Sequence, residues 1–431
     1  MSMSSVAKPD LVANGGIYSL SWPDQGILIR VDRIAEHKNE VTGEITVRTT
    51  LPGLAPHLHQ ARLNLTSTTA RKTLARALTE RISLPWDDIL EQACVLTLQA
   101  QRAGELISEV GNQPREVTPP WLLHPLLRRG QPSLLYGPGK TGKSYIAALC
   151  GLIVQTGQPH TGLTPYPTHD ANVLYLDYEA SSEELNIRVS ALASGMDLPP
   201  GTRLLYRRSY QPLATEIAEI RREVIERNVV LLIVDSLGLA CGGDPEAANS
   251  ILPYFSALRS LVVTSLTVHH IPKDAARGPY GSVYVVNMAR SAYEVKRAQE
   301  TGGTDIQVGI YHRYANNGRL TPPLGLTFSF AGQDPDGDPE SVTVARQRVI
   351  EVPELAQGLS LRERMKASLR DGKKLVKALA EELGAPETVV RATLNRYKGT
   401  TFVALPGPTQ GDTLWGISAF DSETQGGETG S

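Results

Sequence analysis

The sequence predicts an α/β protein whose core is a mostly parallel β-sheet, extended at one edge by antiparallel strands and flanked by two smaller modules. Three observations carry this prediction. Near-continuous apolar runs alternate with helical patterns in the middle of the chain, strand patterns follow one another after Ala289, and a proline-rich segment separates this region from the N-terminal part. Apolar runs separated by helices are typical of strands buried on both faces of a parallel sheet.

The composition is that of an ordinary globular protein. The chain has 431 residues, 41% of them hydrophobic and 20% charged, which excludes a disordered chain and a single small module. Its 43 Lys and Arg residues against 45 Asp and Glu residues give a formal net charge of −2. Since no global charge favours nucleic acid or a membrane, any contact with DNA has to come from local patches.

The cysteines and the apolar runs indicate where in the cell the protein is found. Cys94, Cys150 and Cys241 are far apart and belong to no CxxC or Cys/His spacing, so we expect a reducing setting and no zinc site. The sequence has no apolar run of about 18 residues and no signal-peptide core. We therefore expect a cytoplasmic protein with no membrane partner.

Residues 1–116 predict a small αβ module. Strand patterns fill residues 15–51, and helical patterns follow over residues 66–82 and 85–110. A proline-rich connector then places the first domain boundary near Val117.

This module contains no catalytic constellation. His57 and His59 lack metal-spaced partners, and Trp86-Asp87-Asp88 predicts a capped helix start. We therefore expect a collar or interaction domain.

Residues 117–355 predict the main domain. Its first strands, each separated from the next by a helical pattern, are SLLYG, VLYLDYE, RLLYRRS, VVLLIVDS and LVVTSLTVHH. The later strands predict antiparallel hairpins and are SAYEVKRAQ, IQVGIYHRY, LGLTFSFAG and SVTVARQRVI. The Asp-rich loop over residues 332–339 lacks the spacing and terminal Glu of an EF-hand, so we expect a hairpin turn there rather than a calcium site.

A glycine-rich motif follows the first of these strands and opens a helix. The sequence GPGKTGKS matches GxxxxGK[ST] in the strand–loop–helix context that this motif requires. Glycines let backbone N–H groups surround phosphates, Lys143 reaches the β- and γ-phosphates, and the Ser144 hydroxyl binds Mg²⁺. We therefore predict ATP and Mg²⁺ as cofactors, against the alternative of a turn that matches by chance. The predicted nucleotide-binding residues are Gly137, Pro138, Gly139, Lys140, Thr141, Gly142, Lys143 and Ser144.

Acidic residues stand at the ends of two predicted strands. Asp235 ends VVLLIVD, where its carboxylate can hold the magnesium shell through water. Asp177 and Glu179 lie just past VLYL, at the edge where open α/β sheets bind ligands, and Glu179 is the candidate general base for the attacking water. The structural alternatives are a strand that simply ends in Asp and a carboxylate that caps the helix beginning near Ser181.

Two histidines end the strand LTVHH. A histidine here can sense the γ-phosphate or a bound nucleic-acid strand, and His270 is the candidate. The alternative is that His269 and His270 are capping or buried polar groups.

Five motifs occur in a fixed order, namely GPGKTGKS, LYLDYEAS, LLIVDSLG, TVHHIPK and RGPYGSVYVVNMAR. In this order and spacing they resemble RecA-type ATPases, specifically the RepA-like hexameric replicative helicases of plasmids and phages. The resemblance covers residues 121–330. It implies a RecA-like core and a prokaryotic cell, with a plasmid or phage context.

The same resemblance implies a ring in which ATP lies between neighbouring subunits. Glu179 would be the base and Asp235 would hold magnesium. His270 would couple the γ-phosphate to the DNA loops, and Arg290 would act in trans as an arginine finger, worth about 10³ to 10⁵ in rate in related systems. The alternative for Arg290 is a helical surface arginine that pairs with Glu294 at i, i+4.

Other trans and pore contacts follow from the resemblance alone. Relatives carry a lysine before an Asn/Gly turn on a later strand, where this chain reads YHRYANNGR and Arg313 or Arg319 would substitute. Residues 238–249 and 271–282 would line the pore as loops. Two cations of the second loop can meet DNA phosphate unless the loop is merely solvated, and they are Lys273 and Arg277.

Residues 356–405 predict helix, helix, turn, helix and strand, which resembles a winged helix-turn-helix domain. Residues 360–399 hold ten basic and five acidic residues, a local balance of +5. This patch favours DNA, although such folds also serve as protein docking modules. Residues 406–431 are rich in Gly, Thr, Ser and Glu, and we expect a disordered tail.

The last helix of this module has two distinct faces. Val390, Leu394 and Tyr397 share one face and predict packing. The other face is predicted to be free to enter a DNA groove, and its candidate DNA-binding residues are Arg391, Asn395 and Lys398.

These features together predict an ATP-hydrolysing motor that acts on single-stranded DNA in replication or repair, as a homo-oligomer of six subunits with replication or recombination proteins as further partners. The runner-up is a RecA-like ATPase that loads or remodels proteins on DNA without unwinding. A third class is a DNA-binding regulator that ATP switches.

Overall fold

The computed structural model describes residues 6–38, 40–104, 111, 120–166, 171–271, 283–300, 302–316, 318–333, 337–407 and 412–418. The chain divides into two compact units. One comprises residues 1–119, 211–229 and 256–263, and the other comprises the remainder. Among the helices of the described ranges, none has the length and apolar character that a bilayer crossing requires.

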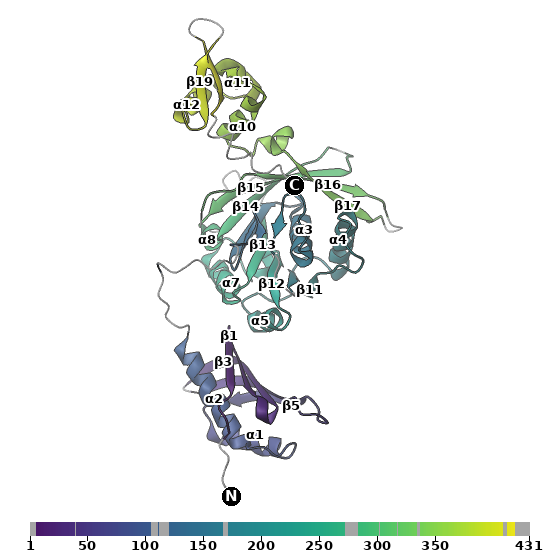
Figure 1. The fold of residues 1–431 in the computed structure, drawn as a ribbon, viewed down its shortest axis with the longest axis vertical. Helices are drawn as coiled ribbons and strands as arrows, with labels where there is room; N and C mark the ends of the chain where they lie inside the picture. The colour runs from purple at the N-terminus through teal and green to yellow at the C-terminus, as the bar shows by residue number, and fades with distance from the viewer. Residues whose placement is uncertain are drawn as a thin grey trace. The chain divides into compact units, whose positions relative to one another are not determined.

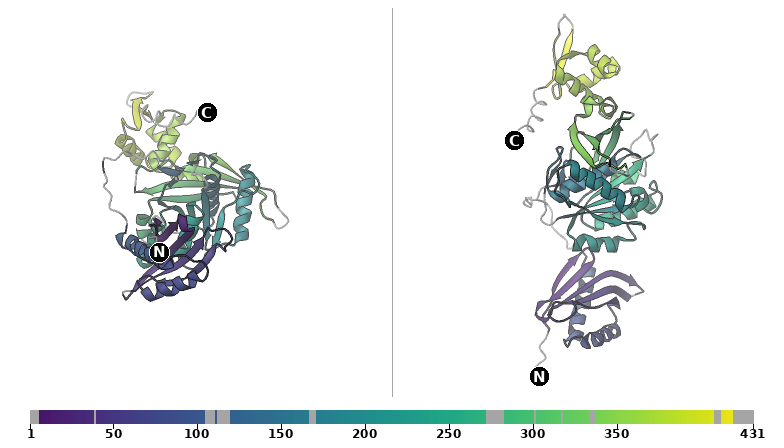
Figure 2. Two further views of the ribbon diagram at one scale, coloured as in Figure 1. Left: turned by 60° about the horizontal axis from the view of Figure 1, so that its bottom comes forward. Right: turned by 90° about the vertical axis from the view of Figure 1, so that its right-hand side faces the viewer.

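The N-terminal strands form an antiparallel meander with two helices on one face. Leu20, Ile29 and Val31 occupy one face of the sheet and are fully buried with apolar residues of both helices. Both helices therefore cover the same side of the sheet (Figures 1 and 2). The elements are β1 (Asp10–Asn14), β2 (Ile17–Trp22), β3 (Ile27–His37), β4 (Glu40–Thr49), β5 (His57–Asn64), α1 (Thr68–Thr79) and α2 (Trp86–Ala103).

The N-terminal helices begin in different ways. Ser67 caps α1, because its side chain accepts a hydrogen bond from the Ala70 amide. The expected start of α2 is confirmed, since the helix begins at Trp86 with Asp87 and Asp88 in its first turn, but the expected cap is wrong, because Pro85 precedes the helix without a side-chain cap. Helix α2 ends at Ala103, short of the predicted end; residues 105–110 lie outside the described ranges.

The main sheet has nine strands in the described ranges, in the order β11-β10-β12-β13-β8-β14-β15-β16-β17. The pairs β10–β11, β12–β13, β13–β8 and β8–β14 are parallel, whereas β14 to β17 pair antiparallel. The predicted fold class, a parallel core with an antiparallel extension, is confirmed. The strands are β8 (Pro132–Pro138), β10 (Asn172–Asp177), β11 (Leu205–Arg208), β12 (Val229–Asp235), β13 (Thr264–Ile271), β14 (Ser291–Ala298), β15 (Asp305–Ala315), β16 (Leu324–Ala331) and β17 (Ser341–Gln347).

Helices cover both faces of this sheet. Leu266 and Val268 of β13 pack in one core with residues of α3 and α4, which Figure 1 shows beside one another. Thr267 between them points to the opposite face, where its hydroxyl meets that of Tyr254 on α7 at 2.7 Å. In chain order, the helices of this part of the chain are α3 (Lys143–Thr156), α4 (Ser182–Gly195), α5 (Ile217–Glu226), α6 (Leu237–Ala240), α7 (Ala248–Ser260) and α8 (Val283–Met288). A small separate sheet contains β6 (Trp121–His124), β7 (Leu127–Arg128) and β9 (Thr164–Pro165).

Helix α4 packs closely on the antiparallel extension through Gly195. A Cβ atom at this position would lie 2.1 Å from the Val342 carbonyl oxygen and 2.7 Å from the Thr343 amide nitrogen. Because these are backbone atoms, they can yield only if α4 and β17 move apart. We expect Gly195→Ala to lower the free energy of unfolding by about 1–3 kcal/mol, measured by urea unfolding. The exposed neighbour Ser194 is the control, and a Gly195→Ala variant as stable as Ser194→Ala would contradict this packing argument.

The C-terminal module contains three helices and a three-stranded antiparallel sheet in the order β18-β20-β19. Val390, Leu394 and Trp415 are buried in its own apolar core. The predicted tail is wrong for residues 413–417, which form β20 and pair with β19. Its elements in the described ranges are α10 (Leu361–Ser368), β18 (Lys374–Leu375), α11 (Val376–Leu383), α12 (Glu387–Arg396), β19 (Phe402–Pro406) and β20 (Thr413–Ile417), and the short helix α9 (Pro353–Ala356) precedes the module. Short 3-10 turns are η1 (Pro23–Gln25), η2 (Val349–Glu351) and η3 (Leu369–Asp371).

Candidate functional site

The glycine-rich motif forms the turn between β8 and α3. Lys140 and Gly142 have φ values of 63° and 83°, so the chain turns through left-handed conformations before the helix. A Cβ atom at Gly137 would lie 2.5 Å from the Val295 carbonyl oxygen, which leaves room for glycine alone. Arg297, also on β14, donates a hydrogen bond to the Lys140 carbonyl. Strand β14 therefore supports the turn from the side.

Lys143 is the first residue of α3, and its side chain lies within the glycine-rich turn. Its side-chain Nζ donates to the carbonyl oxygens of Gly137 at 2.9 Å and Pro138 at 2.7 Å, and to the Thr141 hydroxyl at 3.2 Å. The residue is only 2% exposed. Burial lowers the pKa of Lys143 to about 8, although the nearby Asp235 carboxylate opposes this shift. A positive group is thus held at the place that the motif assigns to phosphate.

This lowered pKa predicts proton uptake when a nucleotide binds. At about pH 8.5 part of the free protein carries neutral Lys143, and a triphosphate restores the charge because it favours the ammonium form. The heat of binding should therefore depend on the ionisation enthalpy of the buffer at about pH 8.5 and much less at about pH 7. Isothermal titration calorimetry in two buffers checks this, and equal heats at the higher pH would contradict it.

The lowered pKa of Lys143 also predicts how the stability of the nucleotide-free protein changes with pH. The folded-state pKa of Lys143, about 8, lies below the ordinary value of 10.5. The unfolded chain therefore binds more protons between these values, and stability of the free protein rises with pH across this window.

Asp235 ends β12 and is nearly buried, at 6% exposure. The Tyr175 hydroxyl of β10 donates to its Oδ2 atom at 2.6 Å. Its Oδ1 atom is buried and has no hydrogen-bond partner among the described residues. Mg²⁺ prefers oxygen ligands and usually keeps several bound waters. The Oδ1 atom of Asp235 and the Ser144 hydroxyl are therefore suitable groups for a magnesium site. The residues present therefore fit the predicted cofactor.

Glu179 is held between two donors. Its Oε1 atom accepts from the Ser236 hydroxyl, and its Oε2 atom lies 3.3 Å from His270 Nε2. The hydrogen bond from His270 lowers the pKa of Glu179 most, so the carboxylate is ionised at neutral pH and has no proton of its own to block its role as an acceptor. The alternative that Glu179 caps α4 is wrong, because Ser181 is the cap and accepts from the Glu184 amide.

Asp177 has a different place from Glu179. Its Oδ1 atom accepts from the amides of Glu179 at 2.9 Å and Ala180 at 2.8 Å, which fixes the turn after β10. Burial raises the pKa of Asp177. Asp177 therefore positions the backbone that carries the candidate base.

Three predicted residues come together at the carboxyl ends of three strands. One ligand atom each from Glu179, Asp235 and His270 lies within 4.8 Å of the others. The structure thus brings the candidate base, magnesium residue and phosphate sensor to one place. Tyr175 and Ser236 were not among the predicted residues, although Ser236 follows Asp235 directly and Tyr175 stands two positions before Asp177.

Arg290 lies between α8 and β14 with an exposed side chain. Its backbone N–H donates to the Pro132 carbonyl at 2.9 Å. The helical pair with Glu294 is wrong, because Glu294 lies on β14 and pairs with Arg313 at 2.6 Å. Arg313 also donates to the Gly358 carbonyl at 2.8 Å, so it is engaged within its own chain.

The candidate DNA-binding residues lie in two regions. Lys273 and Arg277 fall outside the described ranges. Arg391 and Asn395 are exposed on α12, opposite the buried Val390. Lys398 is exposed too, but it lies two residues beyond the end of α12.

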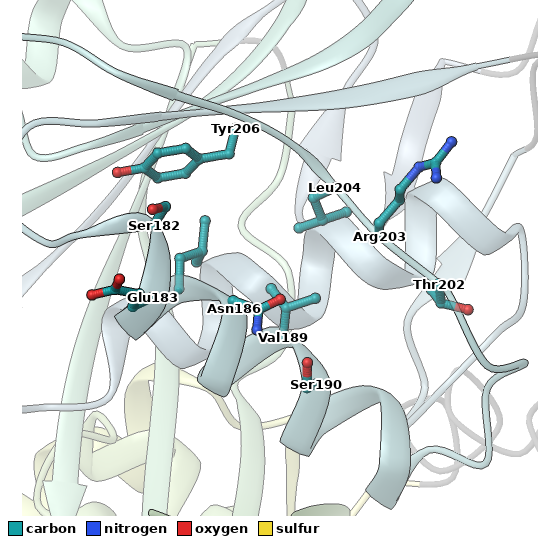
Figure 3. A pocket seen from close by; sticks show the side chains of 10 residues that line it. Ser182, Glu183, Asn186, Val189, Ser190, Thr202, Arg203, Leu204 and Tyr206 are labelled. Atoms are coloured by element: carbon teal, nitrogen blue, oxygen red, sulfur yellow. The ribbon is translucent and has the colours of Figure 1, made fainter.

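A separate pocket of about 420 Å³ lies between α4 and the segment that leads into β11. Figure 3 shows Asn186 and Ser190 of α4 on one side of it and Leu204 and Tyr206 on the other. None of the predicted site residues lines this pocket.

Comparison with known proteins gives a family match for part of the chain. Residues 100–276 match a family model described as an AAA domain. A search of curated proteins found no match. Among solved structures, a KaiC-like protein from the hyperthermophilic archaeon Pyrococcus horikoshii OT3 is similar at 15% sequence identity, over 53% of this chain and 94% of that chain, with a TM-score of 0.37.

The family match includes the glycine-rich turn, Glu179, Asp235 and His270. The turn joins the central parallel strand β8 to a helix; His270 lies on the adjacent strand β13, and the acidic residues stand at the ends of β12 and β10, two and three strands away from β8. These observations agree on one conclusion, that residues 100–276 are similar to an AAA domain and hold a P-loop turn at the edge of a parallel sheet, as a nucleotide-binding site requires.

Proposed function

We propose that this protein is a ring-shaped motor that hydrolyses ATP with Mg²⁺ to move along single-stranded DNA. The observation that carries the proposal is the junction at Glu179. His270 contacts this candidate base directly and stands three residues before Lys273, a cation that can meet DNA phosphate. A change at the γ-phosphate can therefore pass to the DNA-binding segment through one side chain.

The division of labour at the site follows from its contacts. Lys143 and the turn amides bind the phosphates, and Ser144 with Asp235 holds Mg²⁺. Bound Mg²⁺ supplies charge neutralisation on the β- and γ-phosphates. Glu179, ionised and held by Ser236 and His270, accepts the proton of the attacking water.

The C-terminal module supports a DNA-directed role. Its three helices and small antiparallel sheet have the element order of a winged helix. Residues 360–399 hold ten basic and five acidic residues, and Arg391 and Asn395 lie on the exposed face of α12. We propose that this face contacts DNA through phosphate and groove contacts.

A forked DNA duplex tests the motor. We expect ATP-dependent strand separation and a rise in ATPase rate when single-stranded DNA is added. The control is Lys143→Ala, which should separate no strands. ATP hydrolysis that DNA leaves unchanged would overturn the motor, and stimulation without strand separation would favour the loading or remodelling ATPase instead.

A mixing experiment tests the ring and the proposed trans role of Arg290. Lys143→Ala and Arg290→Ala should each be inactive alone. If Arg290 acts on a neighbour's ATP, mixed assemblies contain sites with both residues intact and recover part of the activity. No recovery in assemblies shown to exchange subunits would overturn the trans role.

A further inference from the structure

The hydrogen bond between Tyr175 and Asp235 lies within the site but has no part in the proposed mechanism. The two residues stand on β10 and β12, which are neighbours in the sheet. Tyr175 is 0% exposed and Asp235 is 6% exposed, so water does not compete well for the 2.6 Å hydrogen bond between them.

The two carboxylate oxygens of Asp235 have different environments. The Oδ2 atom accepts from Tyr175, whereas the buried Oδ1 atom has no partner among the described residues. A buried carboxylate oxygen without a donor is unfavourable, and the water shell of a bound Mg²⁺ would supply donors. One oxygen is thus committed to the protein and the other remains for the metal shell.

We propose that Tyr175 is a positioning residue for the Mg²⁺ site, which holds the Asp235 carboxylate through Oδ2 and presents Oδ1 to the waters of the metal. This inference rests on the proposed function, since it requires that Mg²⁺ and nucleotide bind at the glycine-rich turn. Partners of this kind fix the orientation of a ligand, and their loss typically weakens metal affinity by about 10- to 100-fold.

The test uses the full chain and measures binding of a fluorescent ATP analogue against Mg²⁺ concentration, and again in EDTA. We expect Tyr175→Phe to raise the Mg²⁺ midpoint by about 10- to 100-fold and to leave the affinity in EDTA unchanged. Tyr254→Phe is the matched control, because Tyr254 is also buried and its hydroxyl contacts that of Thr267 on the other face of the sheet. The Mg²⁺ midpoint of the Tyr254→Phe variant should equal that of the natural chain.

A second comparison remains valid if Tyr175→Phe alone does not fold. In Asp235→Ala the side chain that Tyr175 holds is gone, so adding Tyr175→Phe should change the Mg²⁺ midpoint no further. A further change in the double variant, or a single Tyr175→Phe variant that folds with an unchanged midpoint, would overturn the proposal. If the natural chain itself shows no Mg²⁺-dependent nucleotide binding, the proposed function fails instead.

Discussion

Lys143→Ala should reduce nucleotide affinity by about 10- to 150-fold and ATP hydrolysis to background, because it removes a charge-assisted contact worth about 1.5–3 kcal/mol. The natural side chain is preorganised for this contact, since three acceptors of the turn hold its Nζ atom and burial keeps water away. Calorimetric titration with an ATP analogue and a phosphate-release assay measure the two effects.

The control for this change is Lys72→Ala, which removes an exposed lysine on α1 and should leave both quantities unchanged. Circular dichroism establishes that each variant is folded. If a folded Lys143→Ala variant binds ATP as tightly as the natural chain, the glycine-rich turn is not the phosphate-binding site.

Glu179→Gln should leave nucleotide affinity within a small factor of the natural value and slow hydrolysis by about 10²- to 10⁴-fold. The amide of Gln keeps the size of the side chain but cannot accept the proton of the attacking water. Single-turnover hydrolysis separates this chemical step from product release, and a binding titration on the same sample shows that the site is filled.

Glu183→Gln is the matched variant for this experiment. Glu183 lies four residues later in the first turn of α4 and is exposed, so its charge can be removed without touching Ser236 or His270. Hydrolysis that slows equally in the two variants would show a general effect of charge, and normal hydrolysis in Glu179→Gln would assign the base to another residue.

The sequence was sufficient to predict the parts of the site that come from strand ends. The glycine-rich turn, Glu179 and Asp235 each follow an apolar run, and parallel strands bring such ends to one edge of the sheet. Tyr175 could not be predicted in the same way. It lies inside an apolar strand, where an aromatic residue is expected for packing, and its role depends on which strand is its neighbour.

Two of the sequence-based predictions were wrong for the same physical reason. Glu294 follows Arg290 at helical spacing, but the chain becomes strand β14 at Ser291, so the spacing has no meaning there. Residues 413–417 have polar and glycine-rich flanks, yet Trp415 is buried and β20 pairs with β19. In both places, pairing with a distant strand decided the conformation, and local pattern does not report such pairing.

The anchoring of Arg290 at Pro132 has a consequence for stoichiometry. Pro132 begins β8 and the glycine-rich turn follows the other end of this strand, six residues on, which at about 3.3 Å per residue is a span of about 20 Å. That span exceeds the reach of one arginine side chain, so Arg290 cannot reach the phosphates bound by its own chain. If Arg290 takes part in hydrolysis as proposed, it acts on a neighbour's ATP, and turnover per molecule should then fall on dilution, as assemblies dissociate.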